Sequence, residues 1–226
     1  MNFTVIGTLA FDFPVGYGYY QYSCLVNAGQ HIYKNVSADG FIENDATTLG
    51  CSSGTCTSKL YQLHNEGKNT YIEGKVISGS ETGMAPEKGL YKFYLANMES
   101  PACDMYKQEW LIERPKIAPN NIPKGMCISG QKIESYTAPY KYERKQDFAF
   151  LDNISRDKAT FTILQTGEVV SEAAKYRYFY GWFYRFLNKY KITKRTHLTC
   201  SGYESHNRRD FFSGIIYEAL LPDKDR

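Results

Sequence analysis

The amino-acid sequence predicts a mainly β protein with antiparallel sheets, arranged as a sandwich or as two abutting β units, a C-terminal helix and stabilising disulfides. Three observations lead to this fold class. Short segments of alternating apolar and polar residues are separated by glycine, proline and asparagine turns. The chain carries 20 tyrosines and 13 phenylalanines, which favour strands, and six cysteines spread over its whole length. We expect residues 1–226 to form a single β-rich domain, with any subdomain boundary near residues 100–124.

The clearest predicted element is a β-hairpin within residues 160–186. Its first strand, residues 160–165, is rich in β-branched and aromatic residues, and Gly167 supplies the backbone freedom that a tight turn needs. The returning strand has an aromatic residue at every even position over residues 176–186, which places these rings on one sheet face. The later rings also fit a helical spacing, so we expect a strand to about Tyr180 and leave a short helix after it open.

Further strands are predicted in the first half of the chain from the same alternation. They are residues 2–13 (one strand or a pair), 19–26, 31–36, 59–64, 70–78 and 90–95. We expect residues 65–69 to close a hairpin, and residues 37–58, rich in Asp, Asn, Gly, Ser and Thr, to form an irregular loop. The prolines of residues 100–124 indicate loop and edge structure around one short strand, residues 109–113.

Two more strands and a terminal helix are predicted in the second half. The strands are residues 127–134 and 140–151. The helix is predicted at residues 208–221, with Asn207 or Asp210 as its N-cap and Pro222 after its end. Its apolar residues form one helical stripe: Phe211, Phe212, Ile215, Ile216, Ala219 and Leu220.

The six cysteines predict a disulfide framework, because they are even in number and lack the close pairs of a zinc site. They are Cys24, Cys51, Cys56, Cys103, Cys127 and Cys200. Six cysteines allow about 15 connectivities, among which spacing alone does not decide. A bridge from Cys51 to Cys56 would close a small loop, a bridge from Cys103 to Cys127 would tie the proline-bearing segment, and Cys24 and Cys200 would remain.

The disulfides imply an oxidising compartment, so we expect the protein to be periplasmic or extracellular. The first residues lack the basic start and apolar core of a signal peptide. Two alternatives follow: a mature domain whose leader or membrane anchor lies outside this sequence, or a cytosolic protein with six free thiols. We favour the first.

The charge balance excludes a dedicated nucleic-acid binder. Lysine and arginine total 27 against 24 acidic residues, a net charge of +3, whereas nucleic-acid binders are strongly basic. No cofactor or metal motif is present either. We therefore expect no nucleic acid, cofactor or metal among the ligands of this protein.

No catalytic set is predicted from the sequence. Residues 50–54 match the G-x-S-x-G pattern of serine hydrolases, but the pattern requires a buried strand before it and a helix after it. A polar stretch precedes it here and Cys56 follows, so Ser52 is expected to be dispensable. His197 and His206, and the carboxylates Glu73, Glu109, Glu113 and Glu143, give no way to choose an acid and base pair.

The predicted partner-binding region comprises exposed polar loops and the aromatic and basic stretch after Gly181, because Tyr and Arg are the residues from which interface hot spots are made. Its anchors are predicted to be Tyr184, Arg185, Tyr203, His206, Arg208 and Arg209.

The second half of the chain resembles bacterial periplasmic immunity proteins that are encoded beside type VI secretion effectors. The residues that carry the resemblance are Gly125-Met-Cys-Ile128, Ile133, Tyr140-Lys-Tyr142, Thr166-Gly-Glu-Val-Val-Ser-Glu172, Tyr178, Gly181-Trp182 and Cys200. The resemblance implies a non-enzymatic inhibitor that binds a cognate effector toxin. The alternatives are a secreted or periplasmic hydrolase with a cleft between sheets and a structural or adhesive surface module.

Overall fold

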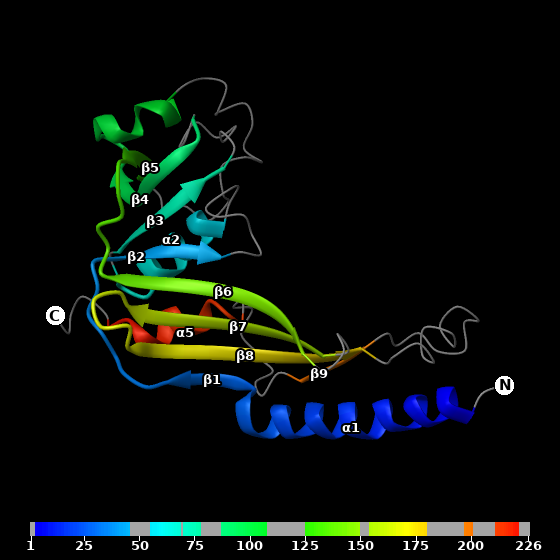
Figure 1. The fold of residues 1–226 in the computed structure, drawn as a ribbon. Helices are drawn as coiled ribbons and strands as arrows, with labels where there is room; N and C mark the ends of the chain where they lie inside the picture. Colours follow the sequence, from blue (N-terminus) through cyan, green and yellow to red (C-terminus); the bar gives the residue numbers. More distant parts are fainter. Residues whose placement is uncertain are drawn as a thin grey trace. The chain divides into compact units, whose positions relative to one another are not determined.

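The computed structural model describes residues 3–45, 55–68, 70–77, 87–107, 125–149, 154–179, 197–200 and 211–221 (Figure 1). Within these ranges the elements are, in chain order, α1 (Phe3–Asn27), β1 (Gly29–Ile32), β2 (Gly40–Asp45), α2 (Thr55–Asn65), β3 (Tyr71–Val76), β4 (Gly89–Asn97), the 3-10 helix η1 (Pro101–Lys107), β5 (Met126–Ile133), β6 (Tyr140–Ala149), β7 (Ile154–Ile163), β8 (Val169–Phe179), β9 (His197–Cys200) and α5 (Gly214–Ala219). The predicted fold class is confirmed: the chain is mainly β, with a C-terminal helix and disulfides.

The described strands form one mixed sheet. Backbone pairing gives the order β1-β8-β7-β6-β2-β3-β4-β5, with β9 paired to β8. β2 is parallel to both of its neighbours, β3 and β6, whereas the pairs β3–β4, β4–β5 and β8–β9 are antiparallel. β2 therefore joins two parts of the sheet that are distant in sequence, as Phe41 pairs with Ile72 on one side and with Tyr140 on the other.

The chain divides into two compact units, and the first consists of residues 1–31, 145–159 and 172–212. Its core is aromatic, with Tyr20, Tyr176 and Tyr178 at most 5% exposed. Ile154 and Ala174 complete this buried cluster. The core of this unit therefore lies between α1 and the strands β7, β8 and β9.

The second unit consists of residues 32–144, 160–171 and 213–226. Phe41, Ile72 and Phe93 are register partners on neighbouring strands, so their side chains share one sheet face, and all three are at most 4% exposed. α2 contacts β3 and β4 and buries Leu60 and Leu63. This unit therefore has a core of its own.

The predicted hairpin is confirmed. β7 and β8 are its two strands, and Gly167 lies in the turn with a φ of +71°, in the left-handed region that favours glycine. Tyr176 and Tyr178 are buried while Arg177 between them is partly exposed, as a period of two requires. β8 ends at Phe179, close to the expected Tyr180.

The strands predicted at residues 2–13 and 19–26 are wrong, because this part of the chain is the 25-residue helix α1. The β-branched and aromatic residues favour strands locally, and Pro14 with its neighbouring glycines indicated a strand end. Tertiary packing outweighs this local preference, since Tyr17, Tyr20 and Cys24 lie on one helical face and pack against the core.

The strand predicted at residues 59–64 is also wrong, and with it the hairpin closed by residues 65–69. These residues belong to α2 and its end. Cys56, Leu60 and Leu63 are spaced at i, i+4 and i+7 and are all buried, which is a helical pattern. The predicted irregular loop at residues 37–58 contains β2 and the start of α2. Only His31 and Ile32 of the strand predicted at residues 31–36 belong to a strand, β1.

The C-terminal helix is shorter than predicted, since α5 spans only Gly214–Ala219. Its N-cap is Ser213 rather than Asn207 or Asp210, which lie outside the described residues. The predicted apolar stripe is buried at Phe212, Ile215, Ile216, Ala219 and Leu220. Backbone hydrogen bonds join this end to Val36, whose amide donates to the Ala219 carbonyl at 2.8 Å.

Two of the predicted disulfides are confirmed. Cys24 is bonded to Cys200 and Cys103 to Cys127. Cys56 is also disulfide-bonded, while Cys51, its predicted partner, lies outside the described residues. The described part of the chain holds no free cysteine. These bonds indicate an oxidising, extracytoplasmic environment.

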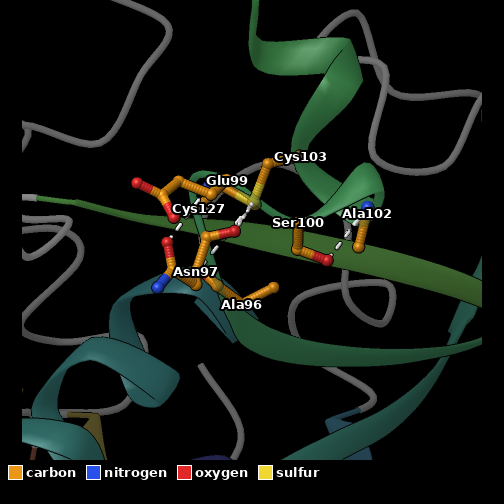
Figure 2. Close-up of a disulfide and its surroundings, with 7 residues drawn as sticks. All are labelled: Ala96, Asn97, Glu99, Ser100, Ala102, Cys103 and Cys127. Atoms are coloured by element: carbon orange, nitrogen blue, oxygen red, sulfur yellow. Dashed lines mark hydrogen bonds between the residues drawn. A yellow bond between two sulfur atoms is a disulfide. The ribbon is translucent and has the colours of Figure 1, made fainter.

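Figure 2 shows how the Cys103–Cys127 bond fixes η1 to the sheet. Both cysteines are fully buried, and Cys103 Sγ lies 3.0 Å from the Asn97 carbonyl oxygen at the end of β4. Polar side chains organise the turn into η1: Asn97 Oδ1 accepts a hydrogen bond from the Glu99 amide and Ser100 Oγ accepts one from the Ala102 amide.

Candidate functional site

The outward face of α1 is the clearest candidate for a binding surface. Val15, Tyr19, Tyr22 and Val26 are 49%, 46%, 60% and 53% exposed, and Leu25 beside them is 84% exposed. The first four are spaced by four, three and four residues, so they form one stripe along the helix. We call Val15, Tyr19, Tyr22, Leu25 and Val26 the α1 stripe.

The opposite face of α1 fixes this stripe to a rigid core. The rings of Tyr17 and Tyr20 lie 6.1 Å and 5.7 Å from the ring of Tyr178, measured between centroids. Cys24 is bonded covalently to Cys200 in β9. The α1 stripe is therefore presented by an element that is packed and covalently anchored within its unit.

The chemistry of the α1 stripe favours an uncharged apolar partner surface. Asp12 is the only charged residue among residues 3–27, and the stripe itself has none. Tyrosine is enriched in protein interfaces, where charged residues are depleted at the centre. A contiguous exposed apolar patch on a folded protein usually marks a binding surface.

Sequence reasoning missed this surface because it assigned residues 2–13 and 19–26 to strands. The signal was present in the spacing of Val15, Tyr19, Tyr22 and Val26, which is helical and does not fit a period of two. The glycines Gly16 and Gly18 and the nearby Pro14 masked this pattern.

The predicted partner anchors Tyr184, Arg185, Tyr203, His206, Arg208 and Arg209 lie outside the described residues. Ser52 and the carboxylates Glu109 and Glu113 also lie outside them. Their predicted roles, and the dispensability of Ser52, stay predictions.

The described carboxylates among the glycosidase candidates have structural partners. Glu73 is fully buried and accepts hydrogen bonds from the Thr137 amide at 2.7 Å and the Ala138 amide at 3.0 Å. Glu143 accepts hydrogen bonds from Lys141 and Asn44. Glu73 therefore secures the turn before β6, and Glu143 belongs to a network on neighbouring strands.

A buried ion pair holds α2 on the sheet. Lys59 Nζ lies 2.6 Å from Glu43 Oε1, and the two side chains are 8% and 0% exposed. The same ammonium lies 4.4 Å from the centroid of the Tyr142 ring, in a cation–π contact. The ion pair fastens α2 to β2 of the sheet, and we assign it a structural role.

Within the described ranges, no group of three or more His, Cys, Asp or Glu side chains is arranged to hold a metal ion. In the same ranges, no helix is both long enough and apolar enough to span a membrane.

Comparisons with protein-family models, with curated proteins and with solved structures gave no match. The resemblance of the second half to immunity proteins therefore stays a prediction.

Proposed function

We propose that this protein is a periplasmic or extracellular binding protein that holds a protein partner on the α1 stripe. The observation that carries the proposal is the exposure of Tyr19 and Tyr22 on a helix whose other face is packed and disulfide-bonded. We further propose that the partner is a secreted antibacterial toxin, which the protein neutralises as an immunity protein. This finer role rests on the resemblance of the second half.

A surface such as the α1 stripe suits an inhibitor that neutralises a toxin by covering it. An inhibitor that occludes a toxin needs complementary shape and a few strong anchors, and it needs no catalytic group. A toxin inhibitor that protects its own cell is expected to bind with a dissociation constant on the order of nanomolar, about 12 kcal/mol. A small number of buried aromatic and arginine side chains supply energies of this size.

The proposal places anchors in two segments. The α1 stripe contributes tyrosines and aliphatic residues, and the aromatic and basic stretch contributes Tyr184, Arg185, Tyr203, His206, Arg208 and Arg209. The first set is apolar and the second carries positive charge, so the partner would combine an uncharged patch with an acidic rim.

The experiment is a calorimetric titration of the full chain with the toxin encoded by the adjacent gene. Tyr22→Glu introduces a charge into the α1 stripe and should weaken binding at least about tenfold, or about 1.4 kcal/mol. Gln21→Glu is the matched control, because it adds the same charge to an exposed neighbouring position outside the stripe. The control should bind as the unmodified protein does.

Two further results decide the proposal. Tyr184→Ala and Arg208→Ala should each weaken binding by about tenfold while the thermal midpoint falls by only a few degrees. Equal binding by the Tyr22→Glu and Gln21→Glu variants would remove the α1 stripe from the interface. If sedimentation showed a dimer that Tyr22→Glu dissociates, the stripe would join two copies of this chain instead.

A further inference from the structure

The second unit contains a pocket that the α1 stripe does not include. Its volume is about 370 Å³, within the range of small-molecule sites. The part of its lining that lies on the α2 side of the sheet consists of Asp39, Leu60, Lys68, Thr70, Leu95 and Met126.

Strand register places two apolar residues of this lining on one face of the sheet. Ile72 pairs with Phe93, and Leu95 lies two residues after Phe93 on β4. Leu95 in turn pairs with Ile128, and Met126 lies two residues before Ile128 on β5. Because side chains on a strand alternate with a period of two, Leu95 and Met126 share the face of Ile72.

The helix α2 covers the same face. Lys59 of α2 forms its ion pair with Glu43, which lies two residues after Phe41 on β2. Phe41 is the register partner of Ile72. Leu60, the next residue of α2, is 1% exposed and lines the pocket. The apolar wall of the pocket on this side therefore consists of Leu60, Leu95 and Met126.

Thr70 brings a buried hydroxyl to this wall. It lies two residues before Ile72, so alternation gives it the same face as Leu95. The residue is 9% exposed, and among the described residues its Oγ1 has no hydrogen-bond partner. Buried hydroxyls in folded proteins are usually paired, because an unpaired one loses its hydration without compensation. A hydrogen-bonding group of a ligand would supply the missing partner.

Three other lining residues belong to the opposite face of the sheet. Tyr71 and Tyr94 alternate with the residues of the apolar wall, and Lys92 is the register partner of Glu73. The ammonium of Lys92 lies 3.6 Å from the centroid of the Tyr71 ring on that face. These residues are therefore not part of the contact with the apolar wall.

The lysine and the aspartate on the α2 side favour an uncharged ligand. Lys68 is 5% exposed, and its ammonium lies 3.0 Å from Glu66 Oε2 and donates to the Tyr217 carbonyl, so Glu66 compensates its charge. Asp39 is exposed and opposes an anion. A charged ligand group against the apolar wall would lose its hydration without gaining an uncompensated partner of opposite sign.

We propose that this pocket binds a small uncharged alcohol, with its hydroxyl group on Thr70 Oγ1 and its apolar body against Leu60, Leu95 and Met126. A hydroxyl both donates and accepts, as the threonine hydroxyl does, so the two groups match. Methionine sulfur makes favourable contacts with aromatic rings, so a phenyl group suits the apolar wall. The site lies within the second unit and is independent of the α1 stripe, which belongs to the first.

The test titrates the full isotope-labelled chain at neutral pH with 2-phenylethanol, 2-phenylethylamine and 3-phenylpropanoate. These probes share the phenylethyl group and differ in charge. Amide signals of Thr70, Leu95 and Met126 should shift and saturate with the alcohol, and the dissociation constants of the two charged probes should be at least about fivefold larger. Equal or tighter binding of either charged probe, or no saturable shift with the alcohol, would overturn the proposal.

The variant Thr70→Val tests the hydroxyl contact, with ethylbenzene as the matched apolar probe. Valine keeps the side-chain shape, so this variant should weaken 2-phenylethanol binding at least about fivefold and leave ethylbenzene binding unchanged. A change in the shape of the pocket would instead affect both probes equally, and that result would overturn the assignment. Thr160→Val is the control, because it lies on β7 of the same unit, outside the pocket lining, and should change neither affinity.

The variant Met126→Ala tests the apolar wall. It removes side-chain contacts without touching the hydroxyl, so it should weaken the binding of 2-phenylethanol and of ethylbenzene to a similar extent, at least about threefold. Unchanged 2-phenylethanol affinity in either Thr70→Val or Met126→Ala would show that the alcohol binds elsewhere, and it would overturn the assignment.

Discussion

Lys59 and Glu43 form a buried ion pair across the boundary between α2 and the sheet, with 2.6 Å between Nζ and Oε1. Removal of one partner leaves the other charge buried, which costs more than the pair itself contributes. The Lys59→Met variant is therefore expected to lower the free energy of unfolding by about 3–5 kcal/mol. Chemical denaturation of the full chain measures this change.

Replacement of both partners tests the same relationship. The double variant Lys59→Met, Glu43→Leu removes both charges and should lie within about 2 kcal/mol of the original protein. A double variant as unstable as Lys59→Met alone would show that the pair acts through something other than charge compensation.

Gly40 is predicted to tolerate no side chain, because the ring of its register partner Tyr71 lies directly over it. A Cβ at Gly40 would lie 2.3 Å from Tyr71 Cε2. Gly40→Ala should lower the free energy of unfolding by about 1–3 kcal/mol, and the loss should shrink in the background of Tyr71→Ala. Thermal melts of the two single variants and the double variant measure this coupling.

Gly18 provides the control of opposite sign. It lies on α1, and a Cβ there would meet no atom within 4 Å. Gly18→Ala should therefore stabilise the protein by about 0.5–1 kcal/mol. Equal losses at Gly40 and Gly18 would argue against a local clash.

The two described disulfides are expected to contribute unequally to stability. They join residues 176 and 24 positions apart, for Cys24–Cys200 and Cys103–Cys127 respectively. Loop-closure entropy gives about 5 kcal/mol for the first bond and about 3.5 kcal/mol for the second. Urea unfolding of the two Cys→Ala double variants should show the larger loss of unfolding free energy when Cys24 and Cys200 are replaced. The reverse order would contradict the entropic argument.

The six cysteines are expected to form three disulfides. The intact mass should therefore rise by about six hydrogens on full reduction.

The exposed ion pair between Glu87, which precedes β4, and Lys132 of β5 is expected to make stability depend on pH. The hydrogen bond from Lys132, at 2.6 Å, and its charge lower the pKa of Glu87 below the ordinary value of 4.5 and raise the pKa of Lys132 above 10.5. The contribution of Glu87 is thus complete above pH 4.5 and is lost as the pH falls through its folded pKa. The contribution of Lys132 is complete below pH 10.5 and is lost as the pH rises through its folded pKa.

Carbon NMR of the Glu87 carboxyl group checks this prediction directly. Its titration midpoint should lie below 4.5 and move upward in Lys132→Gln. Lys158→Gln is a suitable control, since Lys158 pairs with Glu172 instead. An unchanged Glu87 midpoint in Lys132→Gln would exclude the hydrogen bond as the cause.

Sequence patterns predicted the second half of the fold well because its strands have clear local signals. Gly167 marks the turn of the hairpin, and Tyr176 and Tyr178 alternate with the partly exposed Arg177. Strands from Met126 to Ile133 and from Tyr140 to Ala149 also lie where alternation placed them. In these segments the local preference for strand and the alternating burial in the folded protein indicate the same structure.

The first half was predicted less well because local preference and packing disagree there. The aromatic residues of α1 favour strands, yet the helix is stabilised by the contact of Tyr20 with Tyr178 and by the bond of Cys24 to Cys200, both distant in sequence.

The bond between Cys24 and Cys200 also constrains the order in which the chain matures. Cys24 is synthesised before its partner, which follows 176 residues later. The thiol of Cys24 must therefore remain reduced while Cys51, Cys56, Cys103 and Cys127 are synthesised, and any earlier pairing must be reversed by thiol exchange. Efficient production of this protein is thus expected to depend on a disulfide isomerase rather than on an oxidant alone.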